Sequence, residues 1–291
     1  MPNVNKIVIK APAKINLTLF ITGKRGDFYH NIESLMQQVS LFDTLTIEKK
    51  AGSGVEIFCP CEGVPQDGRN ICAKAAENFF SHTGKSFGLE IHIDKKIPIQ
   101  AGLAGGSADA AACLKAFDVL AGTALPGGEL LKIAAETGSD VPFCLSGPAR
   151  LVRGRGEELE EVPPLPDCHI VIVKPSFGSD TGKAYALFDA LPQKRNRTLS
   201  GAALCALERG DLKGAAENLS NDFEGILDIP EIFEIKRRFS AFEAAGSLMS
   251  GSGTAVYGLF YSEKNALSCK TELEKLYEKV FICKPLQNWT K

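Results

Sequence analysis

The stretch that decides the fold is Ile97-Pro98-Ile99-Gln100-Ala101-Gly102-Leu103-Ala104-Gly105-Gly106-Ser107-Ala108-Asp109-Ala110-Ala111. Its small residues let the backbone come close to a ligand, and its glycines tolerate positive φ angles. After Ser107, apolar residues follow at helical spacing, at positions 110, 113, 114 and 117. A loop that leads into a helix in this way directs free N–H groups and the positive end of the helix dipole at one point. The stretch therefore predicts a phosphate-binding loop and a helix that begins near Ser107.

The same residues also fit a simpler structure, a glycine-rich turn before a capped helix. In that interpretation Ser107 is the N-cap and Asp109 is an acidic residue of the first turn. Asp109 counts slightly against phosphate binding, because a carboxylate repels a polyphosphate unless it is turned away or bridged by a metal.

Neither common nucleotide-binding motif is present. A Walker A loop needs a glycine five residues before its Gly-Lys-Ser/Thr, and Phe79 stands at that place before Gly84-Lys85-Ser86. The dinucleotide fingerprint lacks its third glycine at both Gly154-x-Gly156 and Gly251-x-Gly253. The predicted phosphate loop thus belongs to neither class.

Strands and helices alternate irregularly on both sides of the loop. The first strand shows the clearest pattern, with alternate residues Ile15, Leu17, Leu19 and Ile21 on one face. We expect strands at 6–21, 43–48, 55–59, 89–93, 149–153, 169–173, 255–261 and 280–283, and helices at 70–81, 107–121, 128–137, 141–145 and 263–275. This irregular order favours an α+β fold over a doubly wound sheet.

Length and composition limit the possible classes of protein. A chain of 291 residues predicts two domains, and the prolines at 163, 164 and 166 place the boundary between 1–162 and 163–291. The net charge of −2 argues against a nucleic-acid partner. No apolar run is long enough for a membrane span and the first residues do not resemble a secretory signal, so we expect a cytoplasmic protein. The nine cysteines form no Cys-x-x-Cys pair, which predicts buried thiols and argues against a zinc site.

Four separate segments resemble the GHMP small-molecule kinases, over nearly the whole chain. They are Ala11-Pro12-Ala13-Lys14-Ile15-Asn16-Leu17, the loop 102–111, Gly138-Ser139-Asp140-Val141-Pro142-Phe143 and Ser250-Gly251-Ser252-Gly253-Thr254. The opening segment, Tyr29-His30 and the segment around Asp140 are most similar to the members that phosphorylate a cytidyl diphosphate sugar alcohol. Two positions depart from the family pattern, Phe28 where a glycine is usual and Ala108 where a hydroxyl is usual.

The resemblance implies a two-domain fold, with an N-terminal half like domain 2 of ribosomal protein S5 and a ferredoxin-like C-terminal half. It implies ATP with Mg²⁺ as cofactors, and Lys14 and Asp140 as catalytic residues on either side of the substrate hydroxyl. Asp140 would orient or accept the hydroxyl proton, and Lys14 would keep Asp140 ionised. Without the resemblance, Asp140 fits a helix N-cap, and Lys14 with Asn16 fits an exposed polar face of the first strand.

The resemblance also implies the binding residues. Substrate binding falls to Asn16, to Tyr29 and Tyr185 on either side of the cytosine ring, and to His30 at the edge of that ring. The positions expected to bind ATP are Asn70, Lys95, Pro98, Ile99, Gln100, Ala101, Gly102, Leu103, Ala104, Gly105, Gly106, Ser107 and Ala108. Lys95 fits equally well as a solvated lysine at the end of a strand.

Other functions remain possible from the residues. A kinase for homoserine, mevalonate or a sugar is the nearest alternative. A non-catalytic nucleotide-binding relative conflicts with the presence of both Lys14 and Asp140. An RNA-binding module conflicts with the near-neutral charge. A serine hydrolase would need a glycine after Ser107-Ala108, where Asp109 stands.

Overall fold

The computed structural model describes residues 4–27, 29–191 and 199–288. Its contacts divide the chain into two compact units. Unit 1 consists of Met1–Ala13, Phe42–Ile99 and Ala104–Ser146, and unit 2 of Lys14–Leu41, Gln100–Leu103 and Gly147–Lys291. The single boundary predicted between 162 and 163 differs from this division, because two strands and the glycine-rich loop each belong partly to both units.

The sheet of unit 1 is antiparallel in its centre. Its strands are the first part of β1 (Lys6–Asn16), the second part of β3 (His30–Lys50), β4 (Val55–Phe58) and β5 (Gly88–Asp94). β5 runs antiparallel to β3, with Thr44 opposite Asp94, and β4 lies parallel to β5. In β3, Leu45 and Ile47 are fully buried on one face, the period of two expected for a strand with one face in the core.

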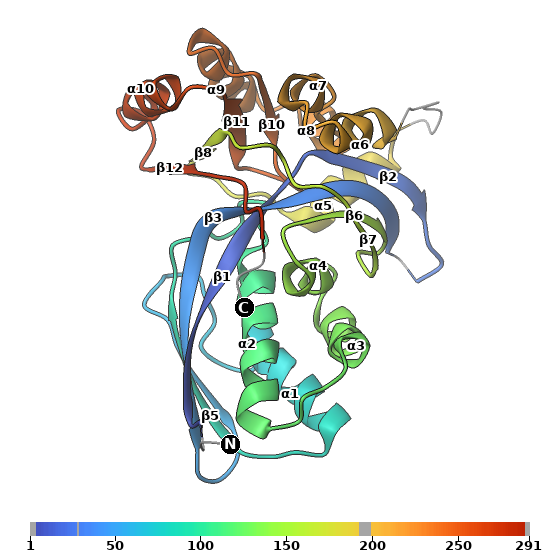
Figure 1. Cartoon of the computed structure of the whole chain (residues 1–291), viewed down its shortest axis with the longest axis vertical. Helices are drawn as coiled ribbons and strands as arrows, with labels where there is room; N and C mark the ends of the chain where they lie inside the picture. Colours follow the sequence, from blue (N-terminus) through green and yellow to red (C-terminus); the bar gives the residue numbers. More distant parts are fainter. Residues whose placement is uncertain (1–3, 28, 192–198, 289–291) are drawn as a thin grey trace. The chain divides into compact units, whose positions relative to one another are not determined.

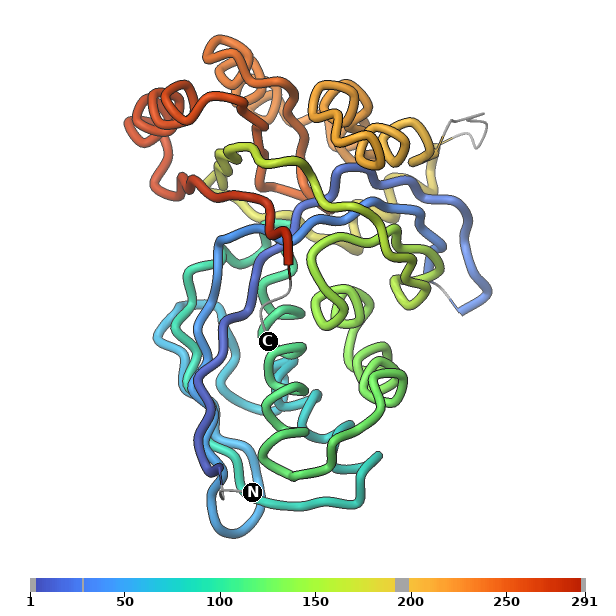
Figure 2. Tube along the Cα trace, viewed as in Figure 1, coloured from blue at the N-terminus to red at the C-terminus, as the bar shows by residue number. Residues whose placement is uncertain are grey.

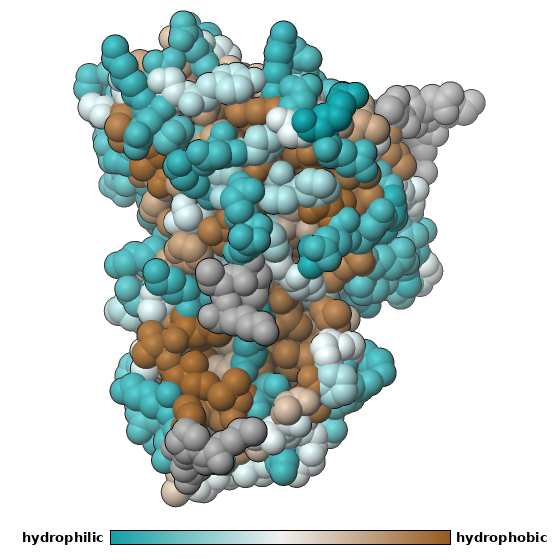
Figure 3. Space-filling view, in the orientation of Figure 1, coloured by the Kyte–Doolittle hydropathy of each residue, from teal (hydrophilic) through white to brown (hydrophobic). Residues whose placement is uncertain are grey.

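Helices cover one face of this sheet (Figure 1). They are α1 (Ile71–Thr83), α2 (Gly105–Ala121), α3 (Gly127–Thr137) and α4 (Val141–Ser146). Phe79 of α1 and Phe117 of α2 meet with their ring centroids 5.9 Å apart, in the core between the helices. Some apolar side chains of the unit stay at the surface, among them Val8 of β1 and Val119 of α2. Figure 3 shows areas of hydrophobic residues on the surface of this unit.

Unit 2 contains two groups of strands. The first joins β2 (Thr18–Lys24) to the first part of β3, then β6 (Ala149–Gly154) and β7 (Glu158–Glu161), all antiparallel. The second is a four-stranded antiparallel sheet in the order β10 (Gly246–Met249), β11 (Val256–Phe260), β8 (His169–Lys174), β12 (Lys279–Cys283). Figure 2 shows that β8 and β11 lie side by side although they are far apart in the sequence.

The helices of unit 2 begin at recognisable signals. They are α5 (Thr181–Asp189), α6 (Gly201–Glu208), α7 (Leu212–Glu217), α8 (Asp222–Leu227), α9 (Pro230–Ala241) and α10 (Glu263–Leu273), and a short strand, β9 (Ser220–Asn221), pairs with β2. α9 starts with a proline and buries Ile232, Ile235 and Phe239 at helical spacing, while Ser262 caps α10. Both helices pack on the four-stranded sheet.

Two expectations about the first strands need correction. The predicted strand 6–21 is divided at Leu17 into β1 and β2. β3 starts at His30 and not near residue 43. Its first half was missed because Ser34, Gln37 and Gln38 are polar yet buried, which hides the alternation of apolar residues.

Candidate functional site

The first part of the glycine-rich loop, residues 100–103, lies in unit 2 and is held from two sides. The backbone N–H of Lys14 in β1 donates to the carbonyl of Leu103 at 3.1 Å. The N–H of Ala255 donates to the carbonyl of Ala101 at 3.0 Å. The loop is thus fastened between β1 and the turn before β11.

That turn contains the second glycine-rich segment, and the two segments pack backbone against backbone. Gly102 has φ +74°, and a Cβ added there would collide with the carbonyl oxygen of Ser250. Gly251 has φ +56°, and its added Cβ would lie 3.0 Å from the carbonyl oxygen of Gly102. The amide of Asn221 holds the turn by donating to the carbonyls of Met249 and Gly251 at 2.7 and 2.8 Å. Only glycine fits at both contact points.

The N-terminus of α2 lies in unit 1 and carries no side-chain cap. Ala104 is the N-cap residue with left-handed φ and ψ of 54° and 31°. The first helical bond joins the N–H of Ala108 to the carbonyl of Ala104, so the N–H groups of Gly105, Gly106 and Ser107 have no acceptor within the helix. The helix predicted from Ser107 begins two residues earlier, because the glycines already form the first turn, and the alternative in which Ser107 is the N-cap is wrong. Such a terminus suits an anion.

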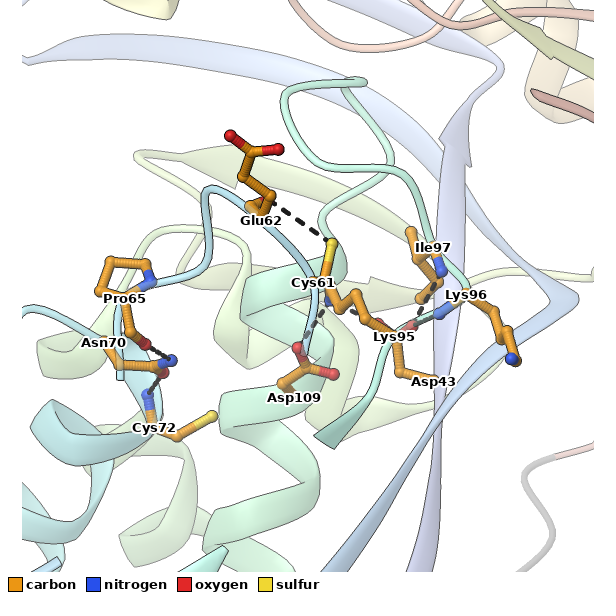
Figure 4. Close-up of polar contacts among 10 residues, drawn as sticks. All are labelled: Asp43, Cys61, Glu62, Pro65, Asn70, Cys72, Lys95, Lys96, Ile97 and Asp109. Carbon is orange, nitrogen blue, oxygen red and sulfur yellow. Dashed lines mark hydrogen bonds and ion pairs between the residues drawn. The ribbon is translucent and has the colours of Figure 1, made fainter. Parts of the chain in front are cut away.

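A buried cluster of charged side chains supports this terminus (Figure 4). The ammonium of Lys95 contacts the carboxylates of Asp43 and Asp109, with a distance of 2.6 Å to Asp109 Oδ2. Asp43 also accepts the backbone N–H groups of Lys96 and Ile97 at 2.6 and 2.8 Å. None of the three charged side chains is more than 4 % exposed, which excludes the solvated lysine that the sequence allowed. Contact of Lys95 with a nucleotide base stays a prediction.

Gly105 is where this cluster meets the helix. A Cβ added to Gly105 would lie 2.9 Å from both Lys95 Nζ and Ile97 Cγ2, closer than van der Waals contact permits. An added Cβ at the next residue, Gly106, would meet only Ile71 Cγ2 at 3.5 Å. The absence of a side chain at Gly105 therefore lets the lysine ammonium reach the first turn of α2.

The electrostatics of the cluster follow from its burial. Burial is the largest cause that raises the pKa of Asp109, and the charge of Asp43 also raises it, so that the pKa stands at about 8 although Lys95 lowers it. Burial lowers the pKa of Lys95, but the two carboxylates outweigh this effect and hold it above its ordinary value. Lys95 is therefore charged, and Asp109 takes up a proton far more readily than an exposed aspartate. Oδ1 of Asp109 has no hydrogen-bond partner among the described residues.

Asn70 has a structural role in unit 1. Its side-chain oxygen accepts the N–H of Cys72 at 2.9 Å and caps α1, and its amide donates to the carbonyl of Pro65 at 2.6 Å. The residue is buried (Figure 4). Asn70 therefore orders the loop before α1, and its contact with ATP stays a prediction.

Asp140 is half-buried in the turn between α3 and α4. Its carbonyl accepts the N–H of Cys144 at 3.1 Å, which fits the position before the helix that the N-cap interpretation expected. Gly138 has little room for a side chain, since an added Cβ would lie 3.2 Å from Ile71 Cδ1. Asp140 belongs to unit 1 and Lys14 to unit 2, so the pairing of the two stays a prediction.

Lys14 and Asn16 lie in a buried polar network of unit 2. The ammonium of Lys14 donates to Asn16 Oδ1 at 2.7 Å, and Asn16 Nδ2 donates to the hydroxyl of Ser34 at 2.8 Å. The Ser250 hydroxyl accepts the backbone N–H of Asn16 at 3.3 Å. Lys14 and Asn16 are 3 % and 1 % exposed, so the interpretation as an exposed polar face is wrong. Both faces of the strand are covered here.

His30 and Tyr185 meet elsewhere in unit 2. Their rings stack with centroids 4.5 Å apart, and the rings of Tyr185 and Phe223 form a T-shaped contact with centroids 4.9 Å apart. His30 Nε2 is 2.8 Å from Asp189 Oδ1, and Lys24 donates to Asp189 Oδ2 at 2.6 Å. Hydrogen bonds from Lys24 and His30 lower the pKa of Asp189, which is therefore ionised at neutral pH.

Tyr29 is half exposed, and the guanidinium of Arg155 lies 4.2 Å from its ring centroid. The ring of Tyr185 is stacked on that of His30. That the rings of Tyr29 and Tyr185 enclose a cytosine stays a prediction. The departure at Phe28 lies outside the described residues, and Ala108 is buried in the core.

Sequence reasoning missed Asp43, Ser34 and Asp189. The pattern offered a signal for the first two. Asp43 falls on the same strand face as the buried Leu45, and Ser34 on the same face as the buried Ile32. A polar residue in a buried row needs a partner and thus marks a network. Asp189 had no such signal, because its partners come from distant segments.

The remaining expectations concern cysteines, metals and membranes. All nine cysteines are free thiols, and all but Cys61 and Cys205 are buried, which confirms their packing role. Among the residues that the structure describes, no three His, Cys, Asp or Glu side chains gather as ligands of a metal ion. No described helix combines the length and the apolar character needed to cross a membrane.

Comparison with known families and proteins places these features in context. Two family models match the chain, "GHMP kinases N terminal domain" over residues 70–148 and "GHMP kinases C terminal" over residues 203–279. The chain is 41 % identical over 278 residues to the 4-diphosphocytidyl-2-C-methyl-D-erythritol kinase of Syntrophomonas wolfei, covering 95 % of this chain and 97 % of the relative. It is 39 % identical over 284 residues to the enzyme of the same name from Moorella thermoacetica, covering 96 % and 99 %.

Solved structures resemble this chain over nearly its full length. A crystal structure of 4-(cytidine 5'-diphospho)-2C-methyl-D-erythritol kinase superposes with a TM-score of 0.81 at 32 % identity, covering 96 % of this chain and 99 % of the other. A homoserine kinase from Cytophaga hutchinsonii superposes with a TM-score of 0.78 at 20 % identity, covering 99 % and 96 %. The second similarity shows a shared fold only.

Proposed function

The chain belongs to the GHMP kinase family, and we propose that it transfers the γ-phosphoryl group of ATP to the 2-hydroxyl of 4-diphosphocytidyl-2-C-methyl-D-erythritol. This is a phosphotransferase reaction with an alcohol acceptor in non-mevalonate isoprenoid synthesis. The observation that carries the proposal is the similarity to relatives of that name over nearly the full length of both chains.

The N-terminus of α2 is the proposed site of the ATP phosphates. Phosphoryl transfer depends chiefly on positioning and on stabilisation of charge. The N–H groups of Gly105, Gly106 and Ser107 supply preorganised donors. The ammonium of Lys95, whose charge is balanced by its carboxylate partners, lies beside Gly105 and supports the first turn of α2. We propose that residues 98–108 and Asn70 line the nucleotide site in this way.

We propose that Lys14 and Asp140 act on the acceptor hydroxyl. Asp140 would orient the hydroxyl and take its proton as the new P–O bond forms. Lys14 would stabilise negative charge on the transferred group, and its hydrogen bond to Asn16 holds the ammonium in place. Asn16, with both side-chain groups already bonded within the protein, would act on the substrate mainly through Lys14.

We propose that the cytosine ring binds at Tyr29, His30 and Tyr185. The stacking of a base on an aromatic ring contributes about 1–3 kcal/mol. The ionised Asp189 would accept from His30 Nε2–H, and in the neutral imidazole Nδ1 would then be an acceptor. An acceptor suits the exocyclic amine of cytosine.

Mg²⁺ would accompany the ATP. The described residues contain no group of three His, Cys, Asp or Glu side chains that could hold the ion. Ser107 in the first turn of α2 offers one hydroxyl oxygen. These residues therefore fit a Mg²⁺ ion that is held mainly by the phosphates of ATP. A bound Mg²⁺ neutralises part of the polyphosphate charge.

The test is release of ADP from Mg-ATP with a panel of alcohols: the cytidyl methylerythritol, homoserine, mevalonate and galactose. We expect turnover with the first alone. Turnover with only one of the other three would replace this function by that of another GHMP kinase. Binding of ATP without turnover of any alcohol would indicate a non-catalytic relative.

A further inference from the structure

Ser34 of β3 has no role in the function described so far, yet it lies at the centre of the polar network around Lys14. Its hydroxyl accepts from Asn16 Nδ2 at 2.8 Å and donates to the carbonyl of Thr18 at 2.5 Å. Ser34 and Asn16 are 0 % and 1 % exposed. We propose that Ser34 is a positioning residue that sets the orientation of the Asn16 amide and thereby holds the ammonium of Lys14 in place. This inference rests on the proposed function, in which Lys14 acts on the transferred group.

The orientation of the Asn16 amide follows from the capacity of its partners. An ammonium can only donate hydrogen bonds, so the group of Asn16 that faces Lys14 at 2.7 Å is the carbonyl oxygen. The NH₂ group of Asn16 then points to the other side and needs an acceptor. The hydroxyl of Ser34 is that acceptor, because its own hydrogen is committed to the carbonyl of Thr18.

The backbone fixes the position of Ser34 in turn. Its carbonyl partner, Thr18, is the first residue of β2, and the N–H of Leu35 donates to the Thr18 hydroxyl at 2.9 Å. β3 is paired with β6 at this level, where Ser34 stands opposite Val152. The acceptor for Asn16 is therefore built into the sheet and needs no movement during the reaction.

Removal of the hydroxyl would unbalance the network. In Ser34→Ala the NH₂ group of Asn16 loses its acceptor and the carbonyl of Thr18 loses its donor in a buried site, which favours a shift of the Asn16 side chain towards the freed carbonyl. The shift moves Oδ1 of Asn16, and with it the ammonium of Lys14 that donates to this oxygen. Displacement of a catalytic group by about 1 Å can lower a rate by up to about 10²-fold.

The experiment measures kcat and KM for the cytidyl substrate and for ATP in three serine variants. For Ser34→Ala we expect kcat to fall at least about tenfold with the KM for ATP unchanged. Ser34→Cys fills the site with a slightly larger thiol that is only a weak acceptor, so its kcat should lie in between. Ser200→Ala is the matched control, since Ser200 is equally buried and bonds the side chain of Thr18 at 2.8 Å without touching Asn16. Its kcat should stay within about twofold of the parent.

A double variant separates positioning from packing. In Asn16→Asp both side-chain oxygens accept, so no NH₂ group needs Ser34 and neither orientation repels Lys14. Ser34→Ala should therefore cost little in the Asn16→Asp background, whereas loss of packing alone would give the same fold loss in both backgrounds.

Several outcomes would overturn the inference. One is a parent-like kcat in folded Ser34→Ala. Another is a kcat in Ser200→Ala that falls as much as the kcat in Ser34→Ala. If Ser34→Ala does not fold, Ser34→Cys decides, and its parent-like kcat would count against the proposal. Failure of the proposed function looks different, because the parent protein itself would not turn over the cytidyl substrate.

Discussion

Replacement of Gly105 by alanine tests whether the buried cluster of Lys95, Asp43 and Asp109 and the N-terminus of α2 depend on each other. The added methyl group would lie 2.9 Å from Lys95 Nζ and from Ile97 Cγ2. A lysine terminus usually moves away at little cost. Here it is held by Asp43 and Asp109 in a site where its side chain is 4 % exposed.

The magnitude follows from these contacts. Overpacking of a buried site costs about 1–3 kcal/mol. If Lys95 loses a carboxylate partner, the cost rises to about 3–5 kcal/mol, because a buried charge is left uncompensated. We therefore expect Gly105→Ala to lower the free energy of unfolding by about 2 kcal/mol.

Gly106→Ala is the matched control. It introduces the same residue in the same helical turn. Alanine raises helix propensity by up to about 1 kcal/mol and restricts the unfolded chain equally in both variants, so these two effects cancel when their unfolding free energies are compared. Its methyl group meets only Ile71 at 3.5 Å, an ordinary contact. We expect it to be as stable as the parent or slightly more stable.

The assay is urea unfolding of both variants without nucleotide, followed by far-ultraviolet circular dichroism. The readout is the difference in unfolding free energy between the two variants, so that activity is not needed. A difference in unfolding free energy below about 0.5 kcal/mol would refute the reasoning, because surface substitutions without specific contacts change stability by that much.

Three further predictions follow from single carboxylates. Asp109→Asn should flatten the pH dependence of stability. The pKa of about 8 in the folded protein lies far above that of an exposed aspartate, so the folded parent binds more protons than the unfolded chain, and its unfolding free energy falls by up to about 1.4 kcal/mol per pH unit as pH rises from about 4 to 8. Equal slopes of unfolding free energy against pH in parent and variant, measured by urea unfolding, would contradict it. Asp140→Asn should lower kcat at least about 10²-fold with ATP affinity nearly unchanged, and an equal loss of ATP affinity in calorimetry would make Asp140 structural. Asp189→Asn should raise the KM for the cytidyl substrate about tenfold or more and leave the KM for ATP unchanged, because His30 loses its ionised partner; an unchanged KM for the cytidyl substrate would separate His30 from base binding.

Local patterns predicted many elements correctly. The helices at 71–83 and 127–137 and the strands at 88–94 and 169–174 were expected within a few residues, because each has a clear apolar period and a turn signal at its ends. The start of α2 was missed by two residues. A serine suggested a cap there, while the chain uses Ala104 in a left-handed conformation and two glycines.

The amino-acid sequence by itself determined the α+β class, the glycine-rich loop before α2 and the resemblance to the GHMP kinases, since these depend on residues that are neighbours along the chain. Only the tertiary structure decided which polar groups meet. Lys95 joins Asp43 across 52 residues and Asn16 meets Ser250 across 234, and no periodicity records such contacts. The physical reason is that a buried charge or amide must find its partner wherever the fold brings one, so the partner is set by packing and not by spacing.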